Sequence, residues 1–211
     1  MIAPADTQPL SRAQLRRRLR SARRSLSSSA QKRASRQLYR LLAQHPAFRR
    51  TKHVALYLAN DGEIDLGLVL AAAQRRGKAT YLPVLNAWPR THMVFQRVRP
   101  GERLVRNRFR IREPLPQPAR QRKTWALGLV LLPLVGFDVD GGRLGMGGGF
   151  YDRSLAFKMK RKNCRKPALF GVAHECQKVG KLPIAAWDVP LDGTITDAGC
   201  YTRASRTFAQ R

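Results

Sequence analysis

Apolar residues recur at two spacings along the chain, and these spacings predict where helices and strands lie. Repeats of three and four residues predict amphipathic helices, and short apolar runs that end in turn residues predict strands. The predicted helices cover residues 11–26, 28–44, 66–76 and 150–160, and the predicted strands cover residues 53–58, 78–85, 92–98, 127–132 and 168–173. Because strands and helices alternate, we expect a single α/β domain. It would hold a mainly parallel sheet with helices on both faces, a Rossmann-like three-layer sandwich with its active site at the carboxyl ends of the strands.

Polar residues mark several helix ends. Ser11 is expected to cap the first helix, and Ser28 with Gln31 stands at capping-box spacing at the start of the second. Asp65 is expected to cap the helix that follows it, and Gly77 to close that helix. The capping residues therefore support the helices that the periodicity predicts.

Six of the sixteen glycines lie between residues 141 and 149, after a predicted strand and before a predicted helix. That order typically forms an anion site, because free backbone N–H groups and the helix dipole converge on one point. Arg143 can hold a phosphate with two hydrogen bonds, and Asp152 can hold a magnesium ion against it. The Walker phosphate loop is excluded, because Gly148 stands where its lysine must be. The dinucleotide-binding fingerprint is excluded, because Phe150 stands where its third glycine must be. The alternative is a surface turn with Asp152 as a partner of the helix dipole.

The segment from Gly142 to Arg153 reads Gly-Arg-Leu-Gly-Met-Gly-Gly-Gly-Phe-Tyr-Asp-Arg. It resembles the signature of the 5-formyltetrahydrofolate cyclo-ligase family, also called methenyltetrahydrofolate synthetase, and the match extends to Pro133 and Phe137-Asp138. The resemblance implies a magnesium-dependent enzyme that uses ATP to convert 5-formyltetrahydrofolate into 5,10-methenyltetrahydrofolate, with release of ADP and phosphate. In that reaction the formyl oxygen is phosphorylated, and N10 of the folate then closes the ring.

The resemblance also implies the nucleotide contacts. Arg12-Ala13-Gln14-Leu15-Arg16 resembles an N-terminal Lys-x-x-x-Arg of the family, whose two cations contact ATP. By spacing alone these arginines are a stripe on one helix face, and such a stripe is usually only solvated. The expected ATP-binding residues are Arg12, Arg16, Arg143, Leu144, Gly145, Met146, Gly147, Gly148, Gly149, Phe150 and Tyr151. Arg143 is also expected to be catalytic.

Glu63 is the acid that the resemblance assigns to the folate and to catalysis. By itself it could be only an acid ahead of the helix at residue 66, but the family has an acid in this Asp-Gly-Glu-Ile context. The expected substrate-binding residues are Leu58, Glu63, Met93, Met146 and Phe150. Met93 alternates with Phe95 along a predicted strand, a pattern more typical of a core.

Asp152 and Asp188 are the two magnesium ligands that the resemblance implies. Asp188 lies in a segment similar to a late His-Asp-x-x-x-Asp of the family, with Trp187 in place of the histidine. Some members carry lysine at Gly148 and tyrosine at Phe150, so Arg143 and magnesium should carry more of the charge stabilisation here. His174 is expected near the site but not as a ligand, because no second cluster has metal-ligand spacing.

The charge of the chain suggests a different class of function. The net charge of +28 over 211 residues favours attraction to polyanions, including ATP and nucleic acid. Residues 100–122 interleave arginines with Phe109 and Ile111, as a nucleic-acid arm or a substrate-side flap would. The alternative function is therefore a nucleic-acid-binding protein on the same fold that has lost catalysis, although an arginine-rich solvated surface explains the charge equally well. A third candidate is a sugar-phosphate isomerase or acyl-transfer enzyme on a similar scaffold.

The remaining features concern boundaries and location. We expect residues 1–10 to be a disordered lead-in, residues 11–202 the cyclo-ligase domain and residues 203–211 a basic tail. Residues 11–35 have the acid-free composition of a transit peptide, but their match to the family favours a retained helix. The odd, scattered cysteines predict reduced thiols in a cytoplasmic protein. We also expect a monomer, and no apolar run is long enough to span a membrane.

Overall fold

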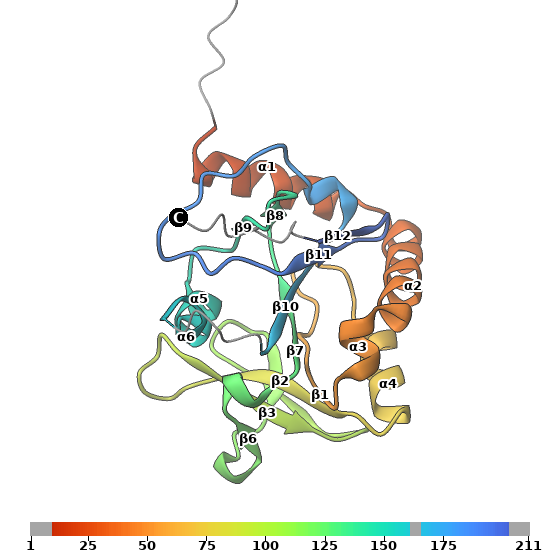
Figure 1. Ribbon diagram of the computed structural model, residues 1–211, viewed down its shortest axis with the longest axis vertical. Coiled ribbons are helices and arrows are strands. Elements are labelled where there is room, and N and C mark those ends of the chain that lie inside the picture. The colour runs from red at the N-terminus through yellow and green to blue at the C-terminus, as the bar shows by residue number, and fades with distance from the viewer. Residues whose placement is uncertain (1–9, 161–165, 203–211) are drawn as a thin grey trace, which may run out of the picture.

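The computed structural model describes residues 10–160 and 166–202, so most of the predicted lead-in, the basic tail and Cys164 lie outside the described residues. An eight-stranded sheet forms the centre (Figure 1). Its strands are β1 (His53–Ala55), β2 (Ala79–Leu85), β3 (Met93–Val98), β6 (Gln121–Arg122), β7 (Leu129–Pro133), β10 (Ala168–Val172), β11 (Gly193–Ile195) and β12 (Cys200–Thr202). They lie in the order β12-β11-β10-β7-β1-β2-β3-β6.

The five central strands are parallel, and the strands at both edges are antiparallel. β1 pairs in parallel with β2 and β7, and β10 pairs in parallel with β7 and β11. β3, β6 and β12 add antiparallel edges. Residues 129–132 of β7 are fully buried, as expected for a parallel strand that is covered on both faces. The prediction of a mainly parallel α/β sheet is confirmed.

Helices cover both faces of the sheet. One core cluster joins one face to α2 (Ser28–Gln44), α3 (Pro46–Arg50) and α4 (Gly67–Arg75). The opposite face packs against α5 (Phe150–Leu155) and α6 (Phe157–Lys160). Figure 1 shows these two groups on opposite sides of the central strands.

The first helix, α1 (Arg12–Arg24), covers neither face of the sheet. It lies across the end where the parallel strands finish, above the short hairpin of β8 (Gly136–Phe137) and β9 (Arg143–Leu144) (Figure 1). Leu15 and Leu19 pack there against Val135, Leu144 and Leu182. This position brings α1 to the edge where ligands bind in open α/β sheets.

The helix caps agree only partly with the sequence predictions. Ser11 forms the predicted cap of α1, completed by the Gln14 side chain as a capping box. The cap of α2 is Ser27 and not Ser28, because the Ser27 side chain accepts the N–H of Ala30. The prediction was one residue late, and the Gln31 side chain instead donates to the carbonyl of Leu26.

The helix after the first strand also begins later than predicted. α4 starts at Gly67, and Asp65 accepts the N–H of Gly67 from just outside the helix. Gly77, with φ +68°, lies just beyond the end of α4, where the prediction placed the closing residue.

Three other elements differ from the predictions. The strand predicted over residues 53–58 pairs with its neighbours only over His53–Ala55. The helix predicted over residues 150–160 is divided at Ala156, whose N–H donates to the carbonyl of Arg153. A short hairpin of β8 and β9 also follows the apolar strand, and its turn contains Gly141 and Gly142, the first two residues of the glycine-rich stretch. Among the described residues, no helix is long and apolar enough to cross a membrane.

The core can be tested on one helix. Leu38 of α2 is fully buried, whereas Leu41 on the same helix is 38% exposed. Because Leu38→Ala leaves a cavity, we expect it to lower the free energy of unfolding by about 2–5 kcal/mol. Leu41→Ala should change it by only about 0.5 kcal/mol. Urea unfolding of both variants measures the difference, and equal losses would contradict the packing described here.

Candidate active site

The N-terminal half of α1 contacts two of the segments that the sequence assigned to ATP and magnesium. Arg12 pairs with Asp188 at 2.7 Å between Nη1 and Oδ2, and it also donates to the carbonyl of Pro183. One turn later, Arg16 donates from Nε to the carbonyl of Gly145 at 2.8 Å. These contacts bring the predicted Arg12, Arg16, Asp188 and glycine-rich loop together at one end of the helix.

The C-terminal half of α1 holds the loop after β1. Arg20, Arg23 and Arg24 all form ion pairs with the carboxylate of Asp61. Arg23 is fully buried, and it also donates to the carbonyls of Asp61 (2.8 Å) and Leu134 (3.1 Å). Burial acts to raise the pKa of Asp61, but the hydrogen bonds from the three arginines outweigh it and lower that pKa to about 2. We call Asp61 and these three arginines the Asp61 cluster.

The Asp61 cluster fixes the turn that presents Glu63. Asp61 has φ +55°, and across the turn the N–H of Asn60 donates to Glu63 Oε2 at 3.1 Å. Burial raises the pKa of Glu63 to about 7, and the attraction of Arg23, 3.9 Å away, only partly opposes this effect. Burial and the Glu63 charge also raise the pKa of Tyr57 and of Tyr151, so a residue of α5 faces the same carboxyl group.

The glycine-rich loop begins at a turn held by a buried carboxylate. Asp138 accepts the N–H groups of Asp140, Gly142 and Leu182. A side chain on Gly142 would lie 2.4 Å from that carboxylate, so glycine is required at this position. Further along, Gly147 (φ +98°) and Gly149 (φ +64°) adopt the left-handed conformation that glycine tolerates best. Residues 146–148 are exposed, and Gly147 lies beside the guanidinium of Arg16.

Arg143, which the sequence analysis assigns to a phosphate, has a carboxylate partner in the structure. Its side chain is buried and forms an ion pair with Asp152. Asp152 Oδ1 also accepts the N–H of Val189, the residue after Asp188. Burial acts to raise the pKa of Asp188, but Arg12 and the N–H of Ala185 hold it below its ordinary value. Two arginine–carboxylate pairs, Arg143–Asp152 and Arg12–Asp188, thus lie side by side.

The remaining predicted contacts divide into exposed and buried residues. Leu58 is half-buried and lines a cavity, and Met146 is 53% exposed on the glycine-rich loop. Phe150 is half-buried, and its ring meets Phe109 edge-on at 5.8 Å between centroids. Leu144 is buried beneath α1, and Met93 is 6% exposed in the core beside α5. The side chains of Leu144 and Met93 therefore pack in the core, and the alternation of Met93 with Phe95 had already pointed to this.

The sequence reading missed three residues that build the site: Arg23, Asp61 and Asp138. Arg23 had one detectable signal, since it follows Leu15 and Leu19 at intervals of four and therefore falls on the buried face of its helix. Asp61 acts through arginines far away in sequence, which no local pattern reveals. Asp138 accepts the N–H groups of Asp140 and Gly142, and an aspartate just before two glycines is a local signal for such a turn.

The carboxylates suit a magnesium ion that is shared with phosphates. No group of three or more His, Cys, Asp or Glu side chains that could hold a metal occurs in the part of the chain that the structure describes. Asp152 and Asp188 nevertheless supply oxygen ligands close together, and magnesium in nucleotide sites usually takes one or two carboxylates plus phosphate oxygens. This donor set fits a magnesium–nucleotide complex better than a metal held by protein alone.

The other reactive side chains lie apart from these pairs. His174 follows β10 and is buried, and its burial lowers its pKa. Cys176 and Cys200 are free cysteines in exposed positions. Partial burial of each sulfur atom still raises the pKa of the thiol, so neither resembles an activated nucleophile.

Together the fold and this site are typical of an α/β enzyme, and the candidate active site lies at the carboxyl edge of the parallel sheet. The chain belongs to the 5-formyltetrahydrofolate cyclo-ligase family, whose model matches residues 9–197.

Individual relatives agree with this assignment. The chain is 37% identical over 178 residues to the 5-formyltetrahydrofolate cyclo-ligase of Escherichia coli (strain K12), a match that covers 84% of this chain and 96% of the relative. It is 35% identical over 182 residues to that of Haemophilus influenzae, with 85% and 94% covered. The NMR structure of Aquifex aeolicus 5,10-methenyltetrahydrofolate synthetase superposes with a TM-score of 0.80 at 28% identity, over 96% of this chain and 97% of that one.

The Asp61 cluster leads to a prediction about stability. Asp61→Asn leaves the buried Arg23 without its carboxylate, so we expect the free energy of unfolding at pH 7 to fall by about 3–5 kcal/mol. Asp140→Asn, an exposed substitution on the β8–β9 turn, should change it by only about 0.5 kcal/mol. Urea unfolding measures both values.

The same cluster has a characteristic pH dependence. The pKa of the Asp61 carboxyl group is about 2 in the folded protein and 3.8 ordinarily. Its contribution to the free energy of unfolding is therefore present above about pH 4 and is lost as the pH falls through 2. Wild type should lose this stability on acidification and Asp61→Asn should not. Parallel pH profiles for the two proteins would contradict the prediction.

Proposed function

We propose that this protein uses ATP to cyclise 5-formyltetrahydrofolate to 5,10-methenyltetrahydrofolate, with release of ADP and phosphate. The observation that carries the proposal is the meeting of three features on α1 in a member of this family. They are the exposed glycine-rich loop, the two neighbouring arginine–carboxylate pairs and the turn that carries Glu63.

The chemical problem is that an amide oxygen is a poor leaving group. Transfer of the γ-phosphoryl group to the formyl oxygen makes phosphate the leaving group, and attack by N10 then closes the ring. Phosphoryl transfer of this kind depends mainly on alignment and charge neutralisation. Arg16 and the main chain of residues 145–149 are placed to hold phosphates, and Arg12 and Arg143 lie beside them as further cations.

Glu63 is suited to handle the folate and a proton. A carboxyl group with a pKa of about 7 exchanges a proton readily at neutral pH. We assign it to positioning the formyl end and to accepting the proton that N10 loses when the new carbon–nitrogen bond forms. Leu58, Phe150 and Met146 are the assigned apolar contacts that have side-chain surface available for the folate.

Magnesium is part of this proposal. Asp152 and Asp188 would hold it together with the phosphates, and the ion would supply additional neutralisation of their negative charge. When phosphates bind, Arg12 and Arg143 can turn part of their hydrogen bonding from these carboxylates to the nucleotide.

The other predictions concern the whole molecule. We propose that residues 11–202 act as one catalytic domain, since strands of a single sheet span residues 53–202.

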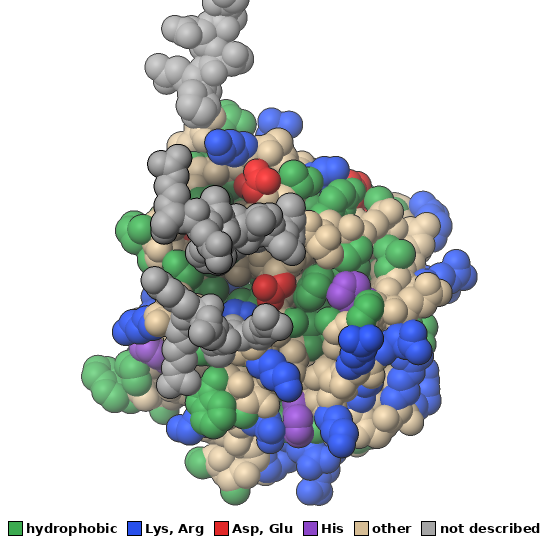
Figure 2. Space-filling view, in the orientation of Figure 1, with side chains coloured by type: hydrophobic (Ala, Val, Ile, Leu, Met, Phe, Trp, Pro, Cys, Tyr) green, Lys and Arg blue, Asp and Glu red, His purple; other side chains and the backbone are tan. Residues whose placement is uncertain are grey.

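The alternative of a nucleic-acid-binding protein without catalysis gains no support from the relatives. Basic side chains greatly outnumber acidic ones on the visible face, and they gather over its lower half (Figure 2). Association with nucleic acid, a monomeric state and a cytoplasmic location stay predictions.

Absorbance in the near ultraviolet tests the activity as methenyltetrahydrofolate forms. We expect turnover only when magnesium and ATP are both present. Asp152→Ala should reduce it at least about a hundredfold, by analogy with the loss of one preorganised charged group. Asp140→Asn should turn over like wild type, and circular dichroism confirms that each variant is folded. Folded wild-type protein without turnover would contradict the proposal.

The pH profile tests the role of Glu63. If its carboxylate accepts a proton, kcat/KM should rise with pH through about 7, and this ionisation should be absent from Glu63→Gln. Because burial raises the folded pKa from 4.5 to about 7, the Glu63 contribution to stability is greatest below about pH 4.5 and falls as the pH rises to 7. Glu63→Gln should remove that fall as well. An unchanged profile in both measurements would exclude Glu63 as the titrating group.

A further inference from the structure

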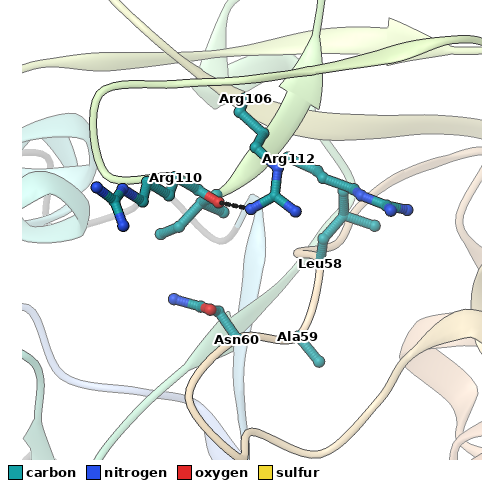
Figure 3. Close-up of a pocket in the computed structure, with 7 residues that line it drawn as sticks. Leu58, Ala59, Asn60, Arg106, Arg110 and Arg112 are labelled. Atoms are coloured by element: carbon teal, nitrogen blue, oxygen red, sulfur yellow. Dashed lines mark hydrogen bonds between the residues drawn. The ribbon is translucent and has the colours of Figure 1, made fainter.

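Basic side chains gather at two places outside the ion pairs of the site. Figure 3 shows the first place, a cavity beside Asn60 that is also lined by arginines from the hairpin of β4 (Leu104–Arg106) and β5 (Arg112–Pro114). Asn60 donates its N–H to Glu63, so these arginines lie at the candidate active site. The second place is the opposite edge of the sheet, where the parallel strands begin and which the proposed function does not use. We call it the amino edge.

Side chains of four neighbouring strands share one face of the sheet near this edge. Tyr81 of β2 lies opposite Arg97 of β3 in the sheet register. Phe95, which points to the same side of β3 as Arg97, lies opposite Arg122 of β6. His53 of β1 also reaches this side, since its Nδ1 lies 3.0 Å from the hydroxyl of Tyr81. Arg97 and Arg122 therefore belong to one surface together with His53.

The charges of this surface converge on His53. Burial lowers the pKa of its imidazole, and the positive charges of Arg122, Arg97 and Lys52 lower it further. The ion pairs among the described residues include none of these three cations. Glu102, the acid that follows β3, is already paired with another arginine. The surface therefore has a positive potential that no neighbouring carboxylate balances.

An exposed tryptophan stands at the end of this surface. Trp125 lies in η2 (Thr124–Ala126), shortly after β6, and is 55% exposed. Arg122 donates from Nε to the carbonyl of Ala126 at 2.9 Å, so its guanidinium holds the turn that presents the indole ring. Lys123, in the same turn, is exposed as well. Proteins bind single-stranded nucleic acid with this chemistry, because aromatic rings stack on bases and cations follow the phosphates.

A basic cavity continues this surface around the amino edge. It has a volume of about 340 Å³ and is lined by Arg49, Arg76 and Lys78. Arg76 and Lys78 lie over the ring of Phe48, which belongs to the core on the other face of the sheet. Lys78 Nζ donates to the carbonyls of Arg49 (3.0 Å) and Thr51 (2.6 Å), so its ammonium group is fixed just before β1. Burial lowers the pKa of Lys78, and the like charge of Arg76 lowers it further.

The two parts together are long enough to meet several phosphates. Residues 51–53 join them, and we call the whole surface the amino-edge strip, which consists of Arg49, Lys52, Arg76, Lys78, Arg97, Arg122 and Trp125. Neighbouring strands lie about 4.8 Å apart, so the part that crosses β1, β2, β3 and β6 spans roughly 15 Å. A single small anion would meet only some of these cations, and the extent of the strip therefore favours a polyanion.

We propose that the amino-edge strip binds single-stranded nucleic acid, with a base stacked on Trp125 and successive phosphates held by the arginines and lysines. The strip is separate from the candidate active site, because α1 lies across the opposite edge of the sheet (Figure 1). Basic side chains also gather over the lower half of the visible face, where β2, β3 and β6 lie (Figures 1 and 2). Nucleic acid bound to the strip leaves the active site open, so binding and turnover can occur in the same molecule.

Fluorescence anisotropy tests the stacking contact. The probe is a labelled oligouridylate of about 20 nucleotides, because one site of this kind covers roughly 4–16 nucleotides. Trp125→Ala should weaken binding about 5- to 150-fold, since it removes one stacked base. Trp125→Phe keeps an aromatic ring and should retain most of the affinity. Trp88→Ala is the matched control, because Trp88 is 85% exposed beyond the other end of β2, and it should bind like wild type.

The dependence of the same binding on salt tests the cations. Each phosphate contact to a single strand contributes about 0.7 to the slope of log K against log salt. Arg97→Ala and Arg76→Ala should therefore each reduce that slope by about 0.7. Arg36→Ala removes an exposed arginine of α2 and is the charge-matched control, which should leave the slope unchanged. Turnover of 5-formyltetrahydrofolate should be the same in all these variants as in wild type.

The binding experiments contain neither ATP nor folate, so failure of the proposed function leaves them valid. Absence of binding by folded wild type at low salt would overturn the proposal, as would equal losses in Trp88→Ala and Trp125→Ala. If magnesium–ATP displaces the oligonucleotide and the strip variants bind like wild type, the nucleic acid occupies the active site and the proposal is wrong. Equal affinity for a duplex of the same length would also contradict it, because paired bases cannot stack on Trp125.

Discussion

The site depends on the burial of one positive charge. Arg23 has no exposed surface, and a buried guanidinium is strongly destabilising unless its hydrogen bonds are satisfied. Its partners are the carboxylate and carbonyl of Asp61 and the carbonyl of Leu134, which belong to segments after two different strands. α1 can therefore adopt only the position that brings both segments to it. The same position sets Arg16 and Arg12, about two and three turns earlier on the helix, against the other two functional segments.

The strong excess of basic residues explains why so many acids are structural. The chain has 41 Lys and Arg but only 13 Asp and Glu. Asp61 neutralises three arginines, Asp138 shapes the turn before the glycine-rich loop, and Asp152 and Asp188 each hold one arginine of the site. With few acids left for the surface, most exposed arginines in the described part of the chain form no ion pair with a carboxylate.

Local sequence patterns predicted the parts of this structure that depend on local physics. Apolar runs identified the parallel strands because β7 and its neighbours are buried on both faces, and glycine positions identified the loop because Gly147 and Gly149 need positive φ. Resemblance to a family, rather than periodicity, supplied Glu63 and Asp188. The Asp61 cluster and the pairing of Arg143 with Asp152 could not be predicted, because these contacts depend on the final packing. The division of the helix at Ala156 also escaped, since residues 150–160 have helical composition throughout.

The arrangement of charge suggests how the site receives a polyanion without creating an unpaired buried charge. Arg12 and Arg143 are already balanced by carboxylates, so the inner part of the site is close to neutral. A magnesium–nucleotide complex brings a cation for the carboxylates and phosphates for the arginines, so each group exchanges one partner for another.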